Sequence, residues 1–353
     1  MNKRGKDGGR RRRTKYGLAR QRQSHLYGAL DLGTNNCRLL IAKPSGPGFR
    51  VIASYSKIVR LGEGLSRNGA LSEDAMARTI AALSICAGKL KDFDVARSRI
   101  VATEACRRAG NCAEFLGEIS DQTGLQLETI SYEEEARLAL VGCQNLLTRK
   151  APYALVFDIG GGSTELTWAH RIADNRFEIL DVLSLPFGVV TLAEECDADQ
   201  IGESGYRKMV DDIASHLPPF CAANGIGGKV TEGEVQMLGT SGTVTTLGAV
   251  HLNLPYYSRS RIDGLEMAFD QLATATRRLS KLNFEDRAAL PCIGEERAEL
   301  VVPGCAILEA ICRSWPVGRL RVADRGLREG MLLELMAEDG NPITGNAPQA
   351  VAH

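Results

Sequence analysis

The chain has 353 residues, which is enough for two ordinary domains, each with its own core. Its 43 basic and 43 acidic residues give a formal net charge of zero, so no global field selects a polyanionic partner. No run of 18 apolar residues occurs, so we expect no membrane-spanning helix.

Basic charge is concentrated at the N-terminus, where residues 1–22 contain ten Lys or Arg and one Asp. A segment with so little apolar content is typical of a disordered tail, which we expect over residues 1–24. A solvated tail is the simpler interpretation, and a tether for nucleic acid or polyphosphate is the alternative. The segment lacks the apolar stretch of a signal peptide.

The ten cysteines form no CxxC pair, and no cluster of Cys and His has the spacing of a zinc site. Most lie in apolar segments such as LSICAGKL and VVPGCAILEA. We therefore interpret them as reduced thiols that fill the core of a cytoplasmic protein.

The first half of the chain alternates strands and helices. Residues 27–42 predict a strand, a turn and a second strand, and residues 49–57 predict the next strand. Residues 72–91 have helical spacing, with Ser72 as N-cap. A strand running into a helix, a short strand and a helix are then expected over residues 99–109, 125–130 and 131–147.

The second half repeats this order, and residues 150–152 are the expected domain boundary. Its predicted elements are a strand–loop–strand unit from residue 150, a strand over 177–188, a helix over 204–218, a strand over 235–238 followed by a helix, helices over 265–282 and 304–313, and a strand, turn and final helix over 319–336. We therefore expect one domain over 25–150, a second over 151–340 whose final helix can pack back on the first, and a loose tail over 341–353.

Two loops share one pattern about 127 residues apart, in DLGTNN after Asp31 and in DIGGGST after Asp158. In both, an apolar strand ends in Asp, one apolar residue and Gly. Glycine lets backbone N–H groups approach an anion, and phosphate is the natural guest of several such groups. A carboxylate beside phosphate makes sense with Mg²⁺ between them. For one such loop alone, an ordinary glycine-rich hairpin is an equally good interpretation. Two matching loops, with a third small-residue loop at 239–243, favour phosphate binding.

These loops, DLGTNNCRLL, DIGGGSTEL and GTSGT, resemble the phosphate loops of the actin, sugar-kinase and heat-shock ATPase superfamily. Further motifs narrow the resemblance to the exopolyphosphatase / guanosine pentaphosphate phosphohydrolase (Ppx/GppA) family, over roughly residues 27–335. They are RLGEGL at 60–65, ATEACRRA at 102–109, SYEEEARLAL at 131–140, LPFGVVTLAE at 185–194 and GLREGML at 326–332.

The resemblance implies an α/β fold of two ribonuclease-H-like domains, as in the actin-like ATPase superfamily, with the active site in the interdomain cleft. It also implies hydrolysis of a terminal phosphoanhydride with Mg²⁺ or another divalent cation. Longer members carry a further helical domain related to HD phosphohydrolases. No His in this sequence is followed by Asp, so we expect the short, two-domain form.

Three consecutive acids, Glu133, Glu134 and Glu135, open the helix predicted at residue 131. Acids in a first turn complement the helix dipole, and Ser131 with Glu134 has the spacing of a capping box. Capping therefore accounts for Glu133 and Glu134 and leaves Glu135. The resemblance makes Glu135 the catalytic base, with Glu134 as the alternative.

We expect Asp158 and Glu165 to position the metal and water, with Asp31 sharing the metal or only bracing its loop. The predicted phosphate-binding residues are Asp31, Gly33, Thr34, Asn35, Arg38, Arg107, Gly160, Gly161, Gly162, Ser163, Thr164, Gly239, Thr240, Ser241 and Gly242. Arg107 takes the position of the family's Arg, and Arg261 is a weaker candidate for contact with phosphate or base. Asn36 stands where many relatives have serine.

The expected reaction is release of terminal orthophosphate from inorganic polyphosphate, guanosine pentaphosphate or both, with exopolyphosphatase placed first. One alternative is a kinase of the same superfamily, although we find no acceptor signature. The other is a regulator that binds guanosine tetraphosphate or pentaphosphate without turnover. The sequence does not give the oligomeric state, and a homodimer is one option.

Overall fold

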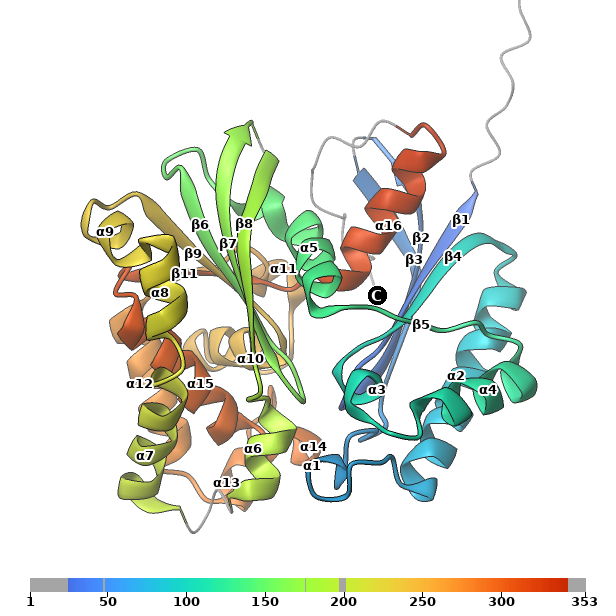
Figure 1. Ribbon diagram of the computed structural model, residues 1–353, viewed down its shortest axis with the longest axis horizontal. Helices are drawn as coiled ribbons and strands as arrows, with labels where there is room; N and C mark the ends of the chain where they lie inside the picture. The colour runs from blue at the N-terminus through green and yellow to red at the C-terminus, as the bar shows by residue number, and fades with distance from the viewer. Residues whose placement is uncertain (1–24, 47, 175, 197–200, 342–353) are drawn as a thin grey trace, which may run out of the picture.

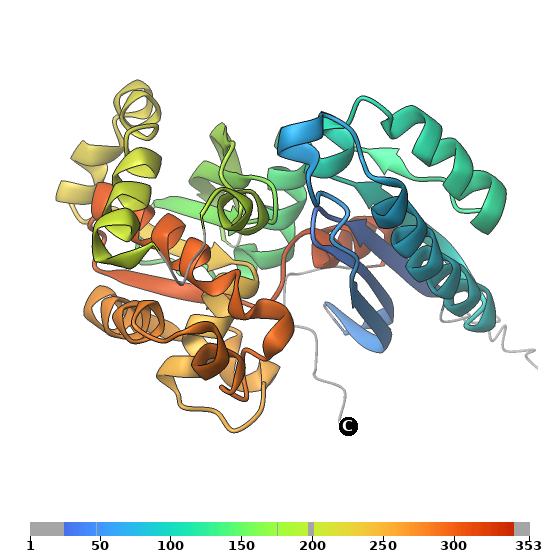
Figure 2. The same ribbon diagram turned by 90° about the horizontal axis from the view of Figure 1, so that it is seen from below.

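A computed structural model describes residues 25–46, 48–174, 176–196 and 201–341. Two mixed β-sheets and the helices around them form two domains that lie side by side (Figures 1 and 2). The strand order of the first sheet is β3 (Gly48–Ile58), β2 (Asn36–Ser45), β1 (Leu26–Leu32), β4 (Val95–Ala102), β5 (Glu128–Thr129). That of the second is β10 (Glu266–Ala268), β11 (Arg319–Ala323), β9 (Val235–Thr240), β6 (Tyr153–Ile159), β7 (Thr164–Ala173), β8 (Arg176–Leu185).

The two sheets share one topology, which confirms the internal duplication. β1 pairs antiparallel with β2 and parallel with β4, and β6 pairs in the same two ways with β7 and β9. Each sheet then continues on one side with an antiparallel strand, β3 or β8. On the other side a parallel strand follows, β5 or β11, and the second sheet adds β10 beside β11. This is the α/β architecture expected from the sequence.

Both faces of the first sheet are covered. The helices that follow its strands are α1 (Leu65–Asn68), α2 (Glu73–Asp92), α3 (Glu104–Arg108), α4 (Cys112–Thr123) and α5 (Tyr132–Cys143), the last continued by the 3-10 turn η1 (Gln144–Leu146). Alternate residues of a strand face opposite sides of a sheet. Accordingly Leu30 packs in the core under α2 and α4, whereas Tyr27 and Ala29 pack against α16 (Leu327–Glu338), the final helix.

The second domain carries more helices. They are α6 (Val189–Glu195), α7 (Gly202–Ala214), α8 (Pro218–Asn224), α9 (Ile226–Thr231), α10 (Gly242–His251), α11 (Arg259–Ile262), α12 (Phe269–Ser280), α13 (Phe284–Ala288), α14 (Glu295–Ala298) and α15 (Val301–Ser314). Its core includes Trp168 of β7 and Trp315, both almost fully buried.

The two domains meet where α5 and α16 cross at backbone contact. A Cβ on Gly142 of α5 would lie 2.0 Å from the carbonyl oxygen of Gly326. A Cβ on Gly330 of α16 would lie 2.0 Å from the carbonyl oxygen of Leu138. Because no side chain fits at such a distance, the crossing requires glycine at both positions.

An ion-pair network ties the same two helices to the first sheet. Arg137 of α5 donates to both oxygens of Glu334 on α16, at 2.5 and 2.9 Å. Its Nε and Nη2 also reach the two oxygens of Glu134, at 2.6 and 2.9 Å. Arg99 of β4 lies 2.9 Å from Glu134. A shared network of this kind holds the first turn of α5 more firmly than an isolated surface pair does.

The structure differs from the sequence prediction in several places. The sequence did not predict the helices α1, α4, α6, α11, α13 and α14. The helix predicted over 265–282 begins as the short strand β10, and α12 starts only at Phe269. The strand predicted over 125–130 is reduced to Glu128–Thr129. Helices α8 and α9 were not predicted, because the glycine-rich stretch 224–228 obscures the helical pattern. The N-terminal tail, and the C-terminal tail beyond residue 341, lie outside the described residues.

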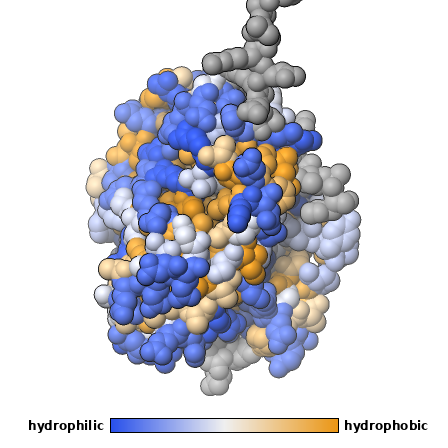
Figure 3. All heavy atoms as spheres, turned by 90° about the vertical axis from the view of Figure 1, so that its right-hand side faces the viewer, coloured by the Kyte–Doolittle hydropathy of each residue, from blue (hydrophilic) through white to orange (hydrophobic). Residues whose placement is uncertain are grey.

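The outer side of the first domain mixes hydrophilic and hydrophobic side chains (Figure 3). This mixture does not single out a class of partner for that face. Of the helices in the described ranges, none combines the length and the apolar character that a membrane crossing requires.

Gly142→Ala is expected to destabilise the protein, because the new methyl group would overlap a backbone oxygen that cannot move without separating α5 from α16. We expect a loss of about 3 kcal/mol in the free energy of unfolding, measured by urea denaturation. Gly117→Ala is the matched control. Gly117 lies exposed in α4 with nothing near its Cβ position, so alanine there should be neutral or stabilise by about 0.5 kcal/mol. Equal effects of both substitutions would contradict the importance of the crossing.

Candidate active site

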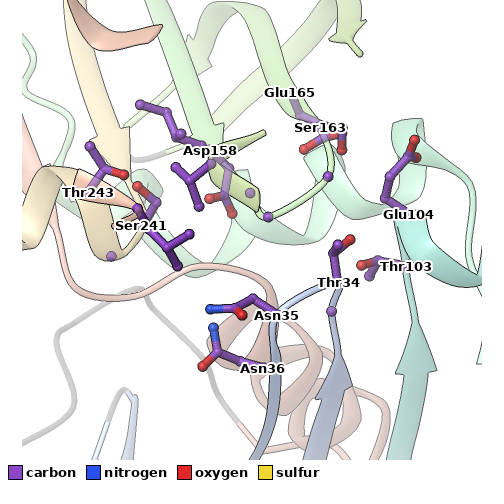
Figure 4. A pocket seen from close by; sticks show the side chains of 18 of the residues that line it. Thr34, Asn35, Asn36, Thr103, Glu104, Asp158, Ser163, Glu165, Ser241 and Thr243 are labelled. Carbon is purple, nitrogen blue, oxygen red and sulfur yellow. The ribbon is translucent and has the colours of Figure 1, made fainter. Parts of the chain in front are cut away.

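Most of the predicted site residues lie around one cavity between the two domains. Those that line it are Asp31, Gly33, Thr34, Asn35, Arg38, Glu135, Asp158, Gly160, Gly161, Gly162, Ser163, Glu165, Ser241 and Gly242. In Figure 4 the side chains from the two domains face one another, with Ser241 and Thr243 at one end and Glu104 at the other. The cavity lies at the carboxyl ends of the parallel strands β1, β4, β6 and β9, the usual place for a ligand in an α/β sheet.

The first loop, residues 33–35, turns the chain from β1 into β2. A hydrogen bond of 2.9 Å from Gly33 N to Asn36 O closes it. Thr34 and Asn35 are polar but only 5% and 8% exposed. The side-chain oxygen Oδ1 of Asn35 is buried without a hydrogen-bond partner among the described residues. An unpaired buried polar atom at a cavity wall indicates a place for a ligand or a water molecule.

The second loop, Gly160 to Ser163, is closed in the same way by a bond of 2.9 Å from Gly160 N to Ser163 O. It lies directly against the first loop. A Cβ on Gly161 would be 3.0 Å from the Cβ of Thr34, and one on Gly162 would be 2.7 Å from Thr34 Oγ1. Glycine at these positions therefore allows the two loops to approach each other as well as a ligand.

At one pair of equivalent positions, the two halves of the duplication carry side chains of opposite charge. Asp31 pairs across β1 and β2 with Arg38, and Asp158 pairs across β6 and β7 with Glu165. The first half thus brings a carboxylate and a guanidinium to the cavity, and the second half brings two carboxylates. The acids that line the cavity come from both domains: Asp31, Glu104 and Glu135 from the first, and Asp158 and Glu165 from the second.

A third segment lines the cavity at the junction between β9 and α10. Ser241 has a φ of +119°, a conformation that residues other than glycine rarely adopt and that stores strain. Its Oγ is buried without a partner among the described residues. Gly242, Thr243 and Thr246 from the start of α10 line the same wall. Unpaired N–H groups at a helix N-terminus, a free hydroxyl and a strained turn together suit an anion.

Three predicted phosphate-binding residues, Thr164, Gly239 and Thr240, do not line the cavity, and their side-chain positions point elsewhere. Thr164 Oγ1 donates to the carbonyl oxygen of Phe187 at 2.7 Å, and Thr240 Oγ1 donates to that of Arg325 at 2.9 Å. Gly239 lies inside β9 against a buried aromatic ring. Alternation along β7 turns Thr164 to the face opposite Glu165, which lines the cavity.

Arg107 lies among three carboxylates. Its Nη1 donates to Glu135 at 2.7 Å, its Nε and Nη2 donate to Glu104 at 3.1 and 2.9 Å, and Nη2 lies 3.9 Å from Glu165. Arg107 does not itself line the cavity, whereas Glu104, Glu135 and Glu165 do. The guanidinium therefore orients the acids from behind, which differs from the direct phosphate contact expected from the sequence.

The three acids at the start of α5 differ in their exposure and in their contacts. Glu133 is exposed, and Glu134 is held in the ion-pair network with Arg137. Glu135 alone of the three reaches the cavity, with 15% of its side chain exposed. Arg261, the weaker candidate, is exposed and lies away from the cavity.

Burial and mutual repulsion raise the pKa values of the acids at the cavity. Burial raises the pKa of Glu135 well above its usual value and the Glu165 carboxylate raises it further, while Arg107 acts in the opposite direction. Burial raises the pKa of Glu165 to about 7, against the hydrogen bond from Ser163 at 2.6 Å. Burial and the Asp31 carboxylate raise the pKa of Asp158 to about 6. So many neighbouring acids favour either bound protons or a bound cation.

The donor set fits a Mg²⁺ ion that shares its coordination with a ligand. Within the described ranges, no group of three or more His, Cys, Asp or Glu side chains has the spacing of a metal cage. Mg²⁺ is commonly held by one or two carboxylates, with phosphate oxygens and water completing the octahedron. Asp158 and Asp31, whose charges already repel each other at the cavity, meet that requirement.

Sequence reasoning missed several cavity residues, namely Thr103, Glu104, Thr243, Thr246 and Arg297. Thr103 and Glu104 follow directly after β4, which runs parallel to β1. The rule that ligands bind beyond the carboxyl ends of parallel strands could have identified both. Arg297 lies in the short helix α14, and no local pattern marks it.

Comparison with known proteins shows which family the chain resembles. A model of the Ppx/GppA phosphatase family matches residues 40–339. The crystal structure of an Aquifex aeolicus member of that family is 27% identical, with a TM-score of 0.74 over 89% of this chain and 98% of that chain. The structure of the Aquifex aeolicus PPX-GPPA enzyme is 29% identical, with a TM-score of 0.71 over 87% and 98%.

An exopolyphosphatase from Cytophaga hutchinsonii shares the fold, with a TM-score of 0.78 over 90% of this chain and 98% of that chain, at 24% identity. The family match spans most of the sequence. It begins after the first loop and includes the second sheet and the cavity residues from Ile58 onward. The chain belongs to the Ppx/GppA phosphatase family.

Proposed function

We propose that this protein hydrolyses the terminal phosphoanhydride of inorganic polyphosphate, guanosine pentaphosphate or both, with Glu135 as general base. The position of Glu135 carries the proposal. It is the one acid of its cluster that lines the cavity, as the two loops do, and burial favours its uptake of a proton. Membership of a phosphatase family supports the same reaction class.

The proposed reaction begins with a water molecule between Glu135 and the terminal phosphate. Glu135 accepts a proton as the water oxygen bonds to phosphorus, and the bridging P–O bond breaks to release orthophosphate and a chain shorter by one phosphate. Arg107 holds the Glu135 carboxylate at 2.7 Å and so fixes its direction. The backbone N–H groups of the two loops and of the α10 N-terminus bind phosphate oxygens and hold the chain in line. Mg²⁺ at Asp158 and Asp31 would neutralise phosphate charge and bring the chain to the carboxylates.

Both substrates present the same reacting group, and the loops contact only phosphates. The geometry of the loops therefore supports either substrate, and the relative rates decide which is used. A protein that binds guanosine nucleotides without turnover would keep the loops and would not need Glu135. The first experiment separates these cases.

Wild-type protein with Mg²⁺ should release orthophosphate from long-chain polyphosphate or from guanosine pentaphosphate, and Glu135→Ala should lose at least about a hundredfold in kcat, because general-base catalysis contributes that much. Glu133→Ala, an exposed neighbour on the same turn, is the control and should retain wild-type rates. If neither substrate is cleaved while one of them binds, the protein is a sensor and not a hydrolase.

Arg107→Gln should move the acidic limb of the kcat/KM pH profile upward by about one unit. Arg107 opposes the raised pKa of Glu135, so its removal raises that pKa further, and the base loses its proton only at higher pH. Arg108→Gln, at the exposed neighbouring position, should leave the profile in place. A loss of activity equal at every pH would indicate that Arg107 instead contacts the phosphate directly.

Asp158→Asn should stabilise the metal-free protein at pH 7.5, by roughly 3 kcal/mol in the free energy of unfolding. The pKa of Asp158 in the folded protein is about 6, which is above the value near 3.9 in the unfolded chain. Protonated Asp158 therefore costs the folded protein no stability at low pH, and the ionised carboxylate lowers the free energy of unfolding as pH rises through 6. The gain should therefore shrink as pH falls toward 4.

The same variant tests the metal. Mg²⁺ should raise the thermal unfolding temperature of wild type more than that of Asp158→Asn, because a cation bound only by the folded state stabilises it. Equal shifts in the two proteins would exclude Asp158 from the cation site.

A further inference from the structure

Two motifs without a role in the chemistry above meet across the cleft. Gly64 lies in RLGEGL of the first domain, and Glu194 ends LPFGVVTLAE of the second. The backbone N–H of Gly64 donates to Glu194 Oε1 at 2.7 Å. Gly64 has a φ of +73°, in the left-handed region that favours glycine. A bond of this length to a carboxylate is a charge-assisted hydrogen bond.

On the first-domain side, the segment 59–64 holds the first loop through its backbone. The N–H groups of Val59 and Arg60 both donate to Asn35 O, at 2.9 and 3.1 Å, and Gly62 N donates to Thr34 O at 2.9 Å. A Cβ on Gly62 would lie 2.3 Å from a methyl group of Thr34, so the two segments are in full contact. A shift of segment 59–64 therefore moves the first loop.

On the second-domain side, helix α6 holds the second loop in the same manner. Val189 N donates to Gly160 O at 3.0 Å, and Val190 N donates to Gly161 O at 2.8 Å. Glu194 lies five residues further along this short helix. A contact at Glu194 is thus transmitted to the second loop through one rigid element.

An outer ion pair accompanies this contact. Arg60 and Glu299 lie 3.0 Å apart across the same gap, but both side chains are 45% exposed. Exposed pairs of this kind contribute little. The bond from Gly64 to Glu194 is shorter, partly buried and made to backbone, so it is the stronger of the two contacts.

From this geometry we infer that Glu194 is a positioning residue that fixes the separation of the first and second loops. Helices α1 and α6 lie at one end of the interdomain gap in Figure 1, and α5 and α16 lie at the other. The crossing of α5 and α16 joins the domains at one end, and Glu194 closes the other end against Gly64. The inference rests on the proposed function, since the loops are taken to bind one chain of phosphates between them.

Glu194→Ala should weaken binding of long-chain inorganic polyphosphate about tenfold, because the loops then spend most of their time too far apart to bind together. Calorimetry in a Glu135→Ala background measures this affinity without turnover. Glu194→Gln retains an oxygen that can accept the Gly64 N–H and should recover most of the loss. Glu195→Ala, at the exposed adjacent position, is the control and should bind as tightly as its parent.

Hydrogen exchange tests the contact independently of phosphate release. In Glu194→Ala, peptides that span residues 33–36 and 59–65 should exchange faster than in wild type, while peptides from α2 should not change. Unchanged exchange in both segments would overturn the inference, as would faster exchange with unaltered affinity. A wild-type protein that releases no phosphate would contradict the proposed hydrolysis, and the exchange rates would still decide the role of Glu194.

Discussion

The position of Glu135 in the site depends on the crossing of α5 and α16. The two backbones approach so closely that glycine is required at residues 142 and 330, and this contact joins the domains where their sheets face each other. Arg137 and Arg99 fix Glu134 in the first turn of α5. Because successive helical residues differ by about 100° in direction, holding Glu134 on the outer side turns Glu135 toward the cavity. Helix packing at the crossing thus determines where the carboxylate lies.

Burying several carboxylates around one cavity lowers the stability of the folded protein, and neighbouring groups offset this cost only in part. Asp31, Asp158, Glu165 and Glu135 are buried around one cavity, and the pKa values of all four are raised by burial. Arg107 opposes this effect at Glu135 and Glu165. Buried acids and a strained backbone persist where the surrounding fold is rigid enough to hold them, and they are concentrated at functional sites. The acids are more costly in the empty cavity than in one that contains a cation.

Much of this arrangement could be predicted, because the signals are local. An apolar strand that ends in Asp and Gly predicts a loop where the strand leaves the sheet. The same pattern recurs 127 residues later, and this recurrence predicted the duplication. The capping pattern at Ser131 singled out Glu135, and the side chain of Ser131 does accept the Glu134 N–H. The directions of Thr164 and Thr240 could not be predicted, since a loop motif does not show which of its members continue into a strand. The bond from Gly64 to Glu194 joins segments 130 residues apart, and no periodicity reports such a contact.

The divergence of the two halves accounts for the chemistry better than their similarity does. At equivalent places each half brings an aspartate to the cavity, and the first half adds the guanidinium of Arg38 where the second adds the carboxylate of Glu165. The proposed cation site takes one aspartate from each half, Asp31 and Asp158, and Glu135 reaches the same cavity from α5. A symmetric pair of acidic halves would repel the chain from both sides, and a symmetric pair of basic halves would hold it without a metal or a base. For the proposed hydrolysis, the duplication supplies two similar loops, and the difference between Arg38 and Glu165 gives them unequal charge.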